Sequence, residues 1–209
     1  IINRNRGGFC FELNLSFNWL LTSLGYNTRI ALADVSCNQP VPAHVVILVE
    51  DLIDVPVLVD VGFGTPGVCN VLLPVKFGVD ATKEDLHGDK FEFRRDDRTD
   101  RFDTALYRTR IDNPEVEEPM YRFSITDDLE NTASEFQEGL DRVLTTSPTF
   151  NGKRLCVLSD SRGHITLGRD YVKWVEKGVA VRRIELPDET AWRAALLEHF
   201  GIFLTPEEC

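Results

Sequence analysis

Apolar residues between positions 11 and 24 recur at the spacing of an α-helix. One stripe runs at intervals of four residues and further apolar side chains widen it; in chain order the set is Phe11, Leu13, Leu15, Phe17, Trp19, Leu20, Leu21 and Leu24. Because polar residues are a minority here, we expect a mostly buried helix. Gly25 stands where a glycine ends a helix. Cys10 is therefore expected at or just inside the helix N-terminus.

After Gly25 the pattern changes to that of β-strands. Strands are expected in stretches rich in Val, Ile and Leu, at residues 28–35, 44–50 and 56–64. The last two are continuous apolar runs, as in strands covered on both faces. Further strands are expected at 90–95 and 120–125, and charged loops at 96–103 and 112–119, the second of which contains prolines.

The last third of the chain predicts a helix, a group of strands and a closing helix. The first helix is expected over residues 129–144, after the acidic residues Asp127 and Asp128. Three short strands are expected at 155–160, 164–168 and 180–186. A final helix should follow, capped by Asp188 or Thr190 and ended by Gly201.

Length and charge narrow the function classes. The 209 residues, 43% hydrophobic, suffice for one large domain or two small ones with a real core. Thirty-four acidic against twenty-three basic residues give a net charge of −11, which would repel nucleic acids and anionic membranes. No apolar run reaches the roughly 20 residues needed to cross a bilayer. We expect neither a nucleic acid nor a membrane as partner.

Cysteine and histidine spacings do not suggest a metal site. The five cysteines include no CxxC pair, so neither a disulfide framework nor a zinc knuckle is indicated. The four histidines form no HxxxH or similar pattern. We therefore predict no metal and a reducing, cytoplasmic location.

Cys10 stands in the stretch RGGFCFELN, residues 6–14. Gly7 and Gly8 allow a sharp approach of the chain to the helix that side chains would block. A buried thiol can be inert core filler. At a helix N-terminus, however, the unpaired amide groups and the helix dipole favour the thiolate.

A nucleophilic thiol needs a base and a third group that orients the base. His44 begins one apolar strand and Asp60 ends the next, so an antiparallel return would bring them together. A carboxylate on a buried strand needs a partner, and an imidazole is a suitable one. The alternatives are a hydrogen-bonded histidine at a strand edge for His44 and ordinary turn chemistry for Asp60.

The order of these motifs resembles that of the arylamine N-acetyltransferases. RGGFCFELN, a histidine that starts an apolar strand, and VDVGFG at residues 59–64 carry the resemblance. It continues through TTSPTFNGKRLCVL at 145–158 and HITLG at 164–168, and so covers most of the chain.

The resemblance implies an α+β, cysteine-protease-like fold with a helix bearing the nucleophile, a β-barrel and an α/β lid. The expected division is a remnant of the N-terminal helical domain over 1–25, the barrel over 26–126, an interdomain helix over 127–145 and the lid over 146–209. Most of the family's N-terminal helices are expected to be absent from this chain, with a missing upstream segment.

The resemblance also implies the chemistry. Cys10 would be the nucleophile, His44 its base and Asp60 the orienting carboxylate. Acetyl-coenzyme A or another acyl-coenzyme A would be a cosubstrate, with no permanently bound cofactor. An arylamine, arylhydroxylamine or hydrazine would then accept the acyl group in a ping-pong reaction, with backbone amides near Cys10 stabilising the oxyanion.

Binding residues follow from the same resemblance. Phe63 would line the acyl and amine pocket, with Phe9 on the same wall. The segment PVPAH before the histidine would contact substrate through Val41 and Ala43. Ser147 and Thr149, in the TSPT stretch, would lie near coenzyme A.

Two points stay open on the sequence alone. A basic patch for the coenzyme A phosphates could come from Lys153 with Arg154, or from Arg94, Arg95 and Arg98, although such residues more often only face solvent. The alternative functions are an amide synthase, a transglutaminase or papain-like enzyme with the same triad, and a non-catalytic homologue that binds ligands without turnover.

Overall fold

The computed structural model describes residues 1, 3, 6–35, 41–64, 71–78, 81–98, 101–126, 133–147 and 152–205. Within them the helices are α1 (Cys10–Ser23), α2 (Ala133–Thr146) and α3 (Glu189–Phe200). The strands are β1 (Thr28–Ala33), β2 (His44–Val49), β3 (Val57–Val59), β4 (Leu73–Pro74), β5 (Lys83–Glu84), β6 (Lys90–Arg95), β7 (Thr104–Arg110), β8 (Asn113–Phe123), β9 (Cys156–Ser159), β10 (Gly163–Leu167), β11 (Tyr171–Glu176) and β12 (Val179–Glu185). None of the described helices is long and apolar enough to span a bilayer.

Helix α1 begins at Cys10, as predicted. Phe9 precedes it in an extended conformation, and the Glu12 carboxylate accepts a hydrogen bond from the Phe9 N–H at 3.1 Å. Gly25 follows the helix with φ +94°, a conformation that side chains rarely adopt. The thiol therefore sits at the end of the helix where backbone N–H groups lack intrahelical partners.

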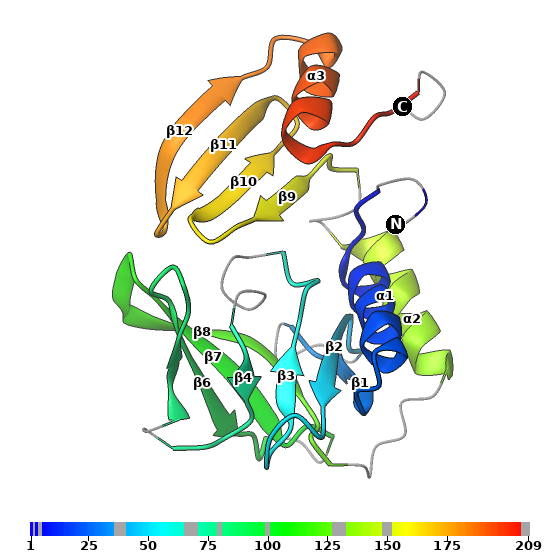
Figure 1. The fold of residues 1–209 in the computed structure, drawn as a ribbon, viewed down its shortest axis with the longest axis vertical. Helices are drawn as coiled ribbons and strands as arrows, with labels where there is room; N and C mark the ends of the chain where they lie inside the picture. Colours follow the sequence, from blue (N-terminus) through cyan, green and yellow to red (C-terminus); the bar gives the residue numbers. More distant parts are fainter. Residues whose placement is uncertain are drawn as a thin grey trace.

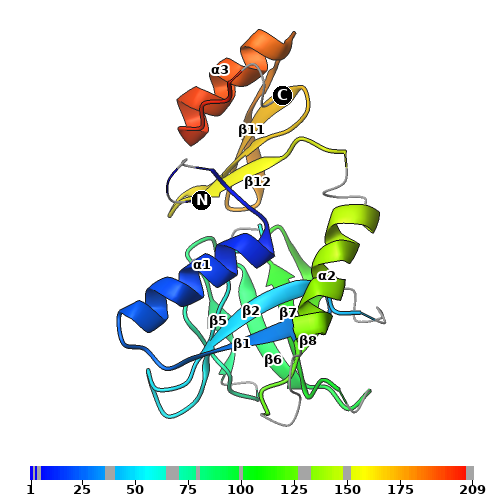
Figure 2. The ribbon, with the colours of Figure 1, turned by 90° about the vertical axis from the view of Figure 1, so that its right-hand side faces the viewer.

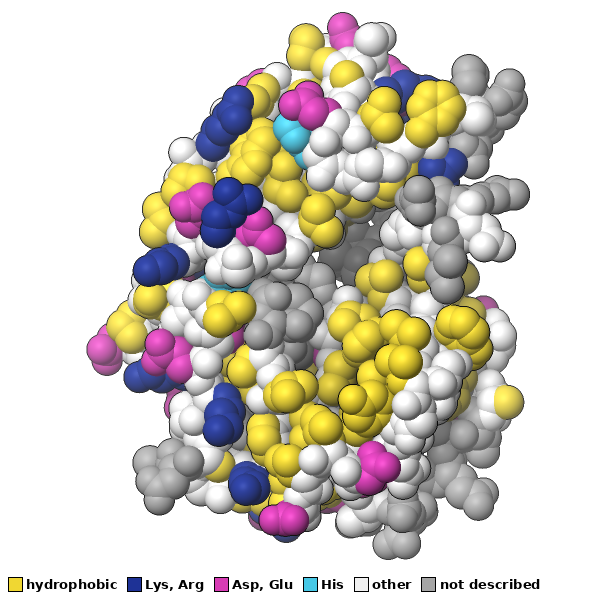
Figure 3. Space-filling view, in the orientation of Figure 1, with side chains coloured by type: hydrophobic (Ala, Val, Ile, Leu, Met, Phe, Trp, Pro, Cys, Tyr) yellow, Lys and Arg dark blue, Asp and Glu magenta, His cyan; other side chains and the backbone are white. Residues whose placement is uncertain are grey.

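The predicted burial of α1 is wrong for most of its length. Only Cys10, Phe11 and Asn14 are buried, whereas Trp19 and Leu24 are 60% and 66% exposed. The buried residues lie near the start of the helix, where it packs on β1 and β2. Figure 3 shows hydrophobic side chains gathered on the outer surface over α1. An apolar majority thus predicted the helix without identifying its buried face.

The middle of the chain forms two antiparallel sheets around one core. Their strand orders are β1-β2-β3-β4 and β5-β6-β7-β8, and side chains from both fill a common cluster around Tyr121 and Phe123. The sheets meet at isolated bridges, Asp34 to Arg122 and Phe77 to Phe93. Among the described residues these strands do not close into the predicted barrel, because only these single bridges join the two sheets.

Residues 112–119, predicted as a loop, belong mostly to strand β8, and its partner β7 was not predicted. The charged side chains that suggested a loop form cross-strand pairs, such as Arg108 with Glu118 at 2.6 Å. Two prolines are tolerated because β8 is an edge strand of its sheet, where a missing N–H need not break a ladder.

The C-terminal sheet has the order β12-β11-β10-β9, with α3 packed on it (Figure 1). Strand β11 lies between the strands expected at 164–168 and 180–186, where the sequence predicted none. Asp188 rather than Thr190 caps α3, accepting from the Ala191 N–H at 2.8 Å, and Gly201 ends the helix at φ +66°. In the chain, α2 follows the strands of the first two sheets and precedes those of the C-terminal sheet, and its predicted acidic start at Asp127 and Asp128 lies outside the described residues. The predicted domain limits remain a prediction.

Candidate active site

The Cys10 side chain lies in a small buried cluster at the start of α1. It is 4% exposed, and its Sγ donates to the Ala43 carbonyl oxygen at 3.9 Å. Leu32 of β1 and Val45 of β2 pack in the same cluster, together with side chains of α2. The thiol is thereby held against the segment that leads into β2.

His44 and Asp60 meet across the antiparallel strands β2 and β3. The Ile47–Val59 pairing sets the register, which returns the chain from the end of β3 to the start of β2. His44 Nε2 lies 2.7 Å from Asp60 Oδ2, and both side chains are buried, at 3% and 1% exposure. The structure thus brings together two residues that the sequence separates by sixteen positions.

Asn14, which sequence analysis overlooked, ties α1 to both strands. Its Nδ2 donates to Asp60 Oδ1 at 2.9 Å and to the Val45 carbonyl, and its Oδ1 accepts from the Val61 N–H at 2.9 Å. Its position one helical turn after Cys10 was the available signal, because residues four apart share a helix face. The asparagine therefore connects the thiol helix directly to the carboxylate.

Burial and charge oppose each other at His44. Burial disfavours the charged imidazole and lowers its pKa, but the charge of Asp60, the hydrogen bond to Asp60 and the neighbouring Cys10 outweigh burial. The net effect raises the pKa of His44 to about 10. At Asp60 burial raises the pKa, and the charge and hydrogen bond of His44, with bonds from Asn14 and the Gly62 N–H, bring it below its usual value. The geometry therefore favours a charged imidazolium–carboxylate pair, and an imidazolium stabilises a neighbouring thiolate.

Aromatic rings surround the imidazole. The His44 ring meets Phe63 edge to face at 5.3 Å between centroids and Tyr121 at 5.2 Å. Burial and the charge of Asp60 raise the pKa of Tyr121 well above its usual value, so the phenol stays protonated. Its hydroxyl approaches the carboxylate without reaching hydrogen-bond geometry. These rings exclude water from one side of the imidazole.

Comparison with known proteins identifies the family of this chain. A family model described as N-acetyltransferase matches residues 1–209. An arylamine N-acetyltransferase of Escherichia coli (strain K12) is 29% identical over 209 residues, which cover 97% of this chain and 69% of that protein. The chain belongs to the arylamine N-acetyltransferase family.

Solved arylamine N-acetyltransferase structures share the fold. The enzyme from Salmonella typhimurium superposes with a TM-score of 0.80 at 24% identity, covering 98% of this chain and 74% of that one. The Mycobacterium marinum enzyme, solved in complex with CoA, superposes with a TM-score of 0.74 at 26% identity. The match covers 96% of this chain and 71% of that one. These matches confirm the predicted α+β, cysteine-protease-like class of fold.

The predicted substrate residues differ in their contacts with the predicted triad. Phe63 contacts the His44 ring, and Phe9 and Ala43 pack against the cluster that contains Cys10. Val41 is partly buried and its carbonyl faces α2. Ser147 directly follows α2, and Thr149 lies outside the described residues.

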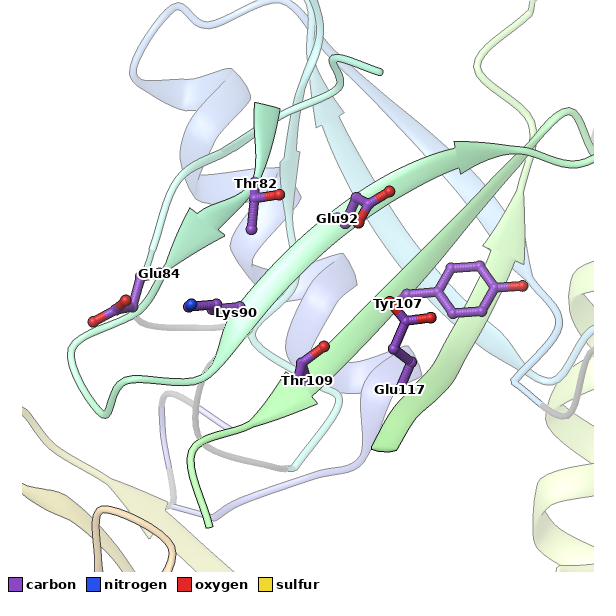
Figure 4. Close-up of a pocket in the computed structure, with 7 residues that line it drawn as sticks. All are labelled: Thr82, Glu84, Lys90, Glu92, Tyr107, Thr109 and Glu117. Carbon is purple, nitrogen blue, oxygen red and sulfur yellow. The ribbon is translucent and has the colours of Figure 1, made fainter. Parts of the chain in front are cut away.

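Three of the four arginines considered for a basic patch are paired with acidic side chains, and the fourth, Arg95, stacks on the ring of Phe77 at 4.1 Å from its centroid. Arg94 bonds to Glu92 and Glu117, Arg98 bonds to Asp96, and Arg154 bonds to Glu189, while Lys153 is exposed. The cluster around Arg94 borders a pocket of about 460 Å³ on the face of β5–β8 opposite the core (Figure 4). Its lining is Thr82, Glu84, Lys90, Glu92, Tyr107, Thr109 and Glu117, which includes none of the predicted triad. We therefore do not assign it to the reaction.

Replacing Asn14 with leucine should destabilise the protein. The change removes three hydrogen bonds and leaves the buried Val45 carbonyl and the partly buried Val61 N–H without this partner, at a cost of about 3 kcal/mol. Urea unfolding should show the lower free energy. Asn18→Leu is the matched control on the same helix, because the partly exposed Asn18 side chain accepts one bond, from Thr28, and should lose much less. Equal losses would contradict the bridging role of Asn14.

The His44–Asp60 pair should make stability depend on pH. The folded pKa of His44 is raised from 6.5 to about 10, so its contribution is complete below pH 6.5 and disappears as the pH rises to about 10. The lowered pKa of Asp60 makes its contribution complete above pH 3.8 and lost as the pH falls below that value. The unfolding free energy of wild type minus that of His44→Gln should therefore be largest between these limits and shrink above pH 6.5. A difference that stays constant up to pH 10 would exclude the charged pair.

Proposed function

We propose that this protein transfers an acetyl group from acetyl-coenzyme A to an arylamine, arylhydroxylamine or hydrazine through a thioester on Cys10. The observation that carries the proposal is the buried 2.7 Å contact between His44 and Asp60 beside the Cys10 thiol, in a chain that belongs to this family. The CoA complex of the Mycobacterium marinum relative supports coenzyme A as the acyl carrier.

In the first half-reaction, the Cys10 thiolate attacks the thioester carbonyl of acetyl-coenzyme A. The negative charge that develops on oxygen needs hydrogen-bond donors, and the N–H groups of the first turn of α1, which lack intrahelical partners, could supply them. The carbon–sulfur bond to coenzyme A then breaks, and the His44 imidazolium gives its proton to the departing sulfur. Cys10 is left as an acetyl thioester and His44 as a neutral imidazole.

In the second half-reaction, the amine nitrogen attacks the acetyl carbonyl on Cys10. Neutral His44 accepts a proton from that nitrogen, and the bond between carbon and Sγ breaks to release the N-acetyl product. The thiolate and the imidazolium are regenerated together. Asp60, bound to Nε2, holds the ring so that Nδ1 stays available to sulfur and substrate in both halves.

The proposed substrate contacts follow from the family resemblance. Phe63 and Phe9 would form the apolar wall for the acyl group and the aromatic amine, and Val41 and Ala43 would line the approach to the thiol. Ser147 and Thr149 would contact coenzyme A, and the C-terminal sheet would act as a lid over it. A cytoplasmic location remains part of the proposal.

Intact-mass measurement after mixing with acetyl-coenzyme A alone tests the proposal. One acetyl group should appear on the wild-type protein and on Cys156→Ser, and none on Cys10→Ser. Burial raises the pKa of the Cys156 thiol, which makes this partly buried cysteine a matched control. Addition of an arylamine should then remove the label. Labelling at another residue, or none at all as for a non-catalytic homologue, would refute the proposed function.

A further inference from the structure

Helix α2 contains one glycine, Gly139, at a position where a side chain has no room. A Cβ built there would lie 2.5 Å from the Pro42 carbonyl oxygen and 3.3 Å from Cζ of Phe11. The first distance is shorter than real Cβ contacts allow, and its partner is backbone. A glycine inside a helix destabilises that helix relative to alanine, so the position is explained by this close approach rather than by helix formation.

Arg142, three residues further on, holds the same segment of chain. Its Nη1 donates to the Val41 carbonyl oxygen at 3.3 Å. Residues three apart lie on one face of a helix, so this face of α2 meets two consecutive carbonyl groups. Phe136, Leu140 and Val143 of α2 also pack into the buried cluster around Cys10. Figure 2 shows α2 standing beside the N-terminal end of α1.

The segment that α2 holds leads directly to the reacting groups. The next carbonyl, that of Ala43, accepts from the Cys10 thiol at 3.9 Å, and the following residue is His44. Phe11, which touches the other side of the Gly139 position, is adjacent to Cys10. One face of α2 therefore contacts both the helix that carries the thiol and the strand that carries the imidazole.

We propose that Gly139, assisted by Arg142, is a positioning residue: the close approach of α2 to Pro42 and Phe11 sets the separation between the Cys10 thiol and the His44 ring. The inference rests on the proposed function for the roles of these two groups. A methyl group at position 139 would push the segment before β2 away from α2, or push α2 away from Phe11. Either movement changes the contact between the Cys10 sulfur and the His44 imidazole, although both side chains are still present.

Alkylation of Cys10 by iodoacetamide, followed by peptide mass spectrometry across a pH series, tests the positioning role. An imidazolium neighbour makes the thiol reactive near neutral pH, whereas an isolated thiol reacts mainly above about pH 8.5. Gly139→Ala should slow alkylation by up to about 10²-fold near pH 6.5, as expected for a displacement of roughly 1 Å. The rate should return toward that of wild type at high pH.

Two further variants complete the test. Arg142→Met keeps the alkyl chain but removes the bond to Val41, and should shift the pH profile in the same direction by a smaller factor. Glu138→Ala changes an exposed neighbour on α2 and should leave the profile unchanged. If Gly139→Ala fails to fold, Arg142→Met alone tests the positioning role. Its bond to the Val41 carbonyl is not needed for helix formation, so this variant should fold.

A folded Gly139→Ala protein with the wild-type pH profile of alkylation would overturn the inference. If Gly139→Ala does not fold, a wild-type pH profile of alkylation in Arg142→Met would overturn it. Alkylation requires neither acetyl-coenzyme A nor an amine. A wild-type protein that accepts no acetyl group, together with a shifted profile in Gly139→Ala, would therefore refute the proposed function and leave the positioning role intact.

Discussion

Asp60→Asn should lower the rate of Cys10 acetylation by about 10³-fold or more, because the amide would stabilise the wrong tautomer of His44. The surrounding bonds determine how the amide would lie. Oδ1 of Asp60 accepts from Asn14 Nδ2 and from the Gly62 N–H, both at 2.9 Å, so the amide oxygen must take that position. The amide NH₂ would then face His44 Nε2 and donate to it, which places the imidazole proton on Nδ1. That nitrogen could no longer accept the thiol proton.

The measurement is the rate of acetyl-enzyme formation by rapid-quench mass spectrometry. Asp54→Asn is a suitable control, since it makes the same change at an exposed position six residues earlier. Asp54→Asn should react as wild type does. An Asp60→Asn protein that is folded and acetylates at the wild-type rate would remove the carboxylate from the mechanism.

Gly62→Ala should reduce acetylation by about 10²-fold through a displacement of the reacting atoms. A Cβ at this position would lie 2.5 Å from Cα of Cys10 and 2.8 Å from Nδ2 of Asn14. Both are parts of the α1 framework, so the start of α1 and the turn after β3 must separate. The cost in stability should be about 1–3 kcal/mol, as for other overpacked cores.

Acetylation rates and thermal unfolding together distinguish displacement from loss of the fold. Gly7→Ala is the matched control, because a Cβ at Gly7 would meet no atom within 4 Å; of the two glycines expected to need an absent side chain, only Gly8 does, with a Cβ 2.7 Å from Cβ of Glu12. Gly7→Ala should leave both quantities unchanged. If Gly62→Ala acetylates as fast as Gly7→Ala, the close contact with Cys10 has no catalytic importance.

The local sequence pattern was sufficient to predict helix ends where a segment carried a strong periodic or capping signal. The start of α1 at Cys10, the cap of α3 at Asp188 and its end at Gly201 were all indicated by short stretches of sequence. Such features depend on backbone groups and side chains within a few residues of one another. The first part of strand β8, residues 113–119, was missed because its charged residues are compensated by partners on β7, which no local pattern displays, whereas its end lies in the strand predicted at 120–125.

The candidate site likewise contains residues that the sequence indicated and residues that only the structure revealed. The order of Cys10, His44 and Asp60, each at the end of a helix or strand, was readable from the sequence together with the family resemblance. The roles of Asn14 and Gly62 could not be read from the sequence, because an asparagine on a helix and a glycine in a turn are common. Their importance comes from neighbours 31 to 52 positions away, at Val45, Asp60 and Cys10.

The sequence by itself determined which segments form the main helices and strands, and which residues are chemically able to form a thiol, imidazole and carboxylate relay. Hydrophobic period and capping are properties of short segments, so they can be read along the chain. Only the tertiary structure decided which face of α1 is buried, that β7 and β8 pair, and that glycines at 62 and 139 allow backbones to approach closely. These features depend on distances between segments remote in sequence, and such distances exist only after the chain has folded.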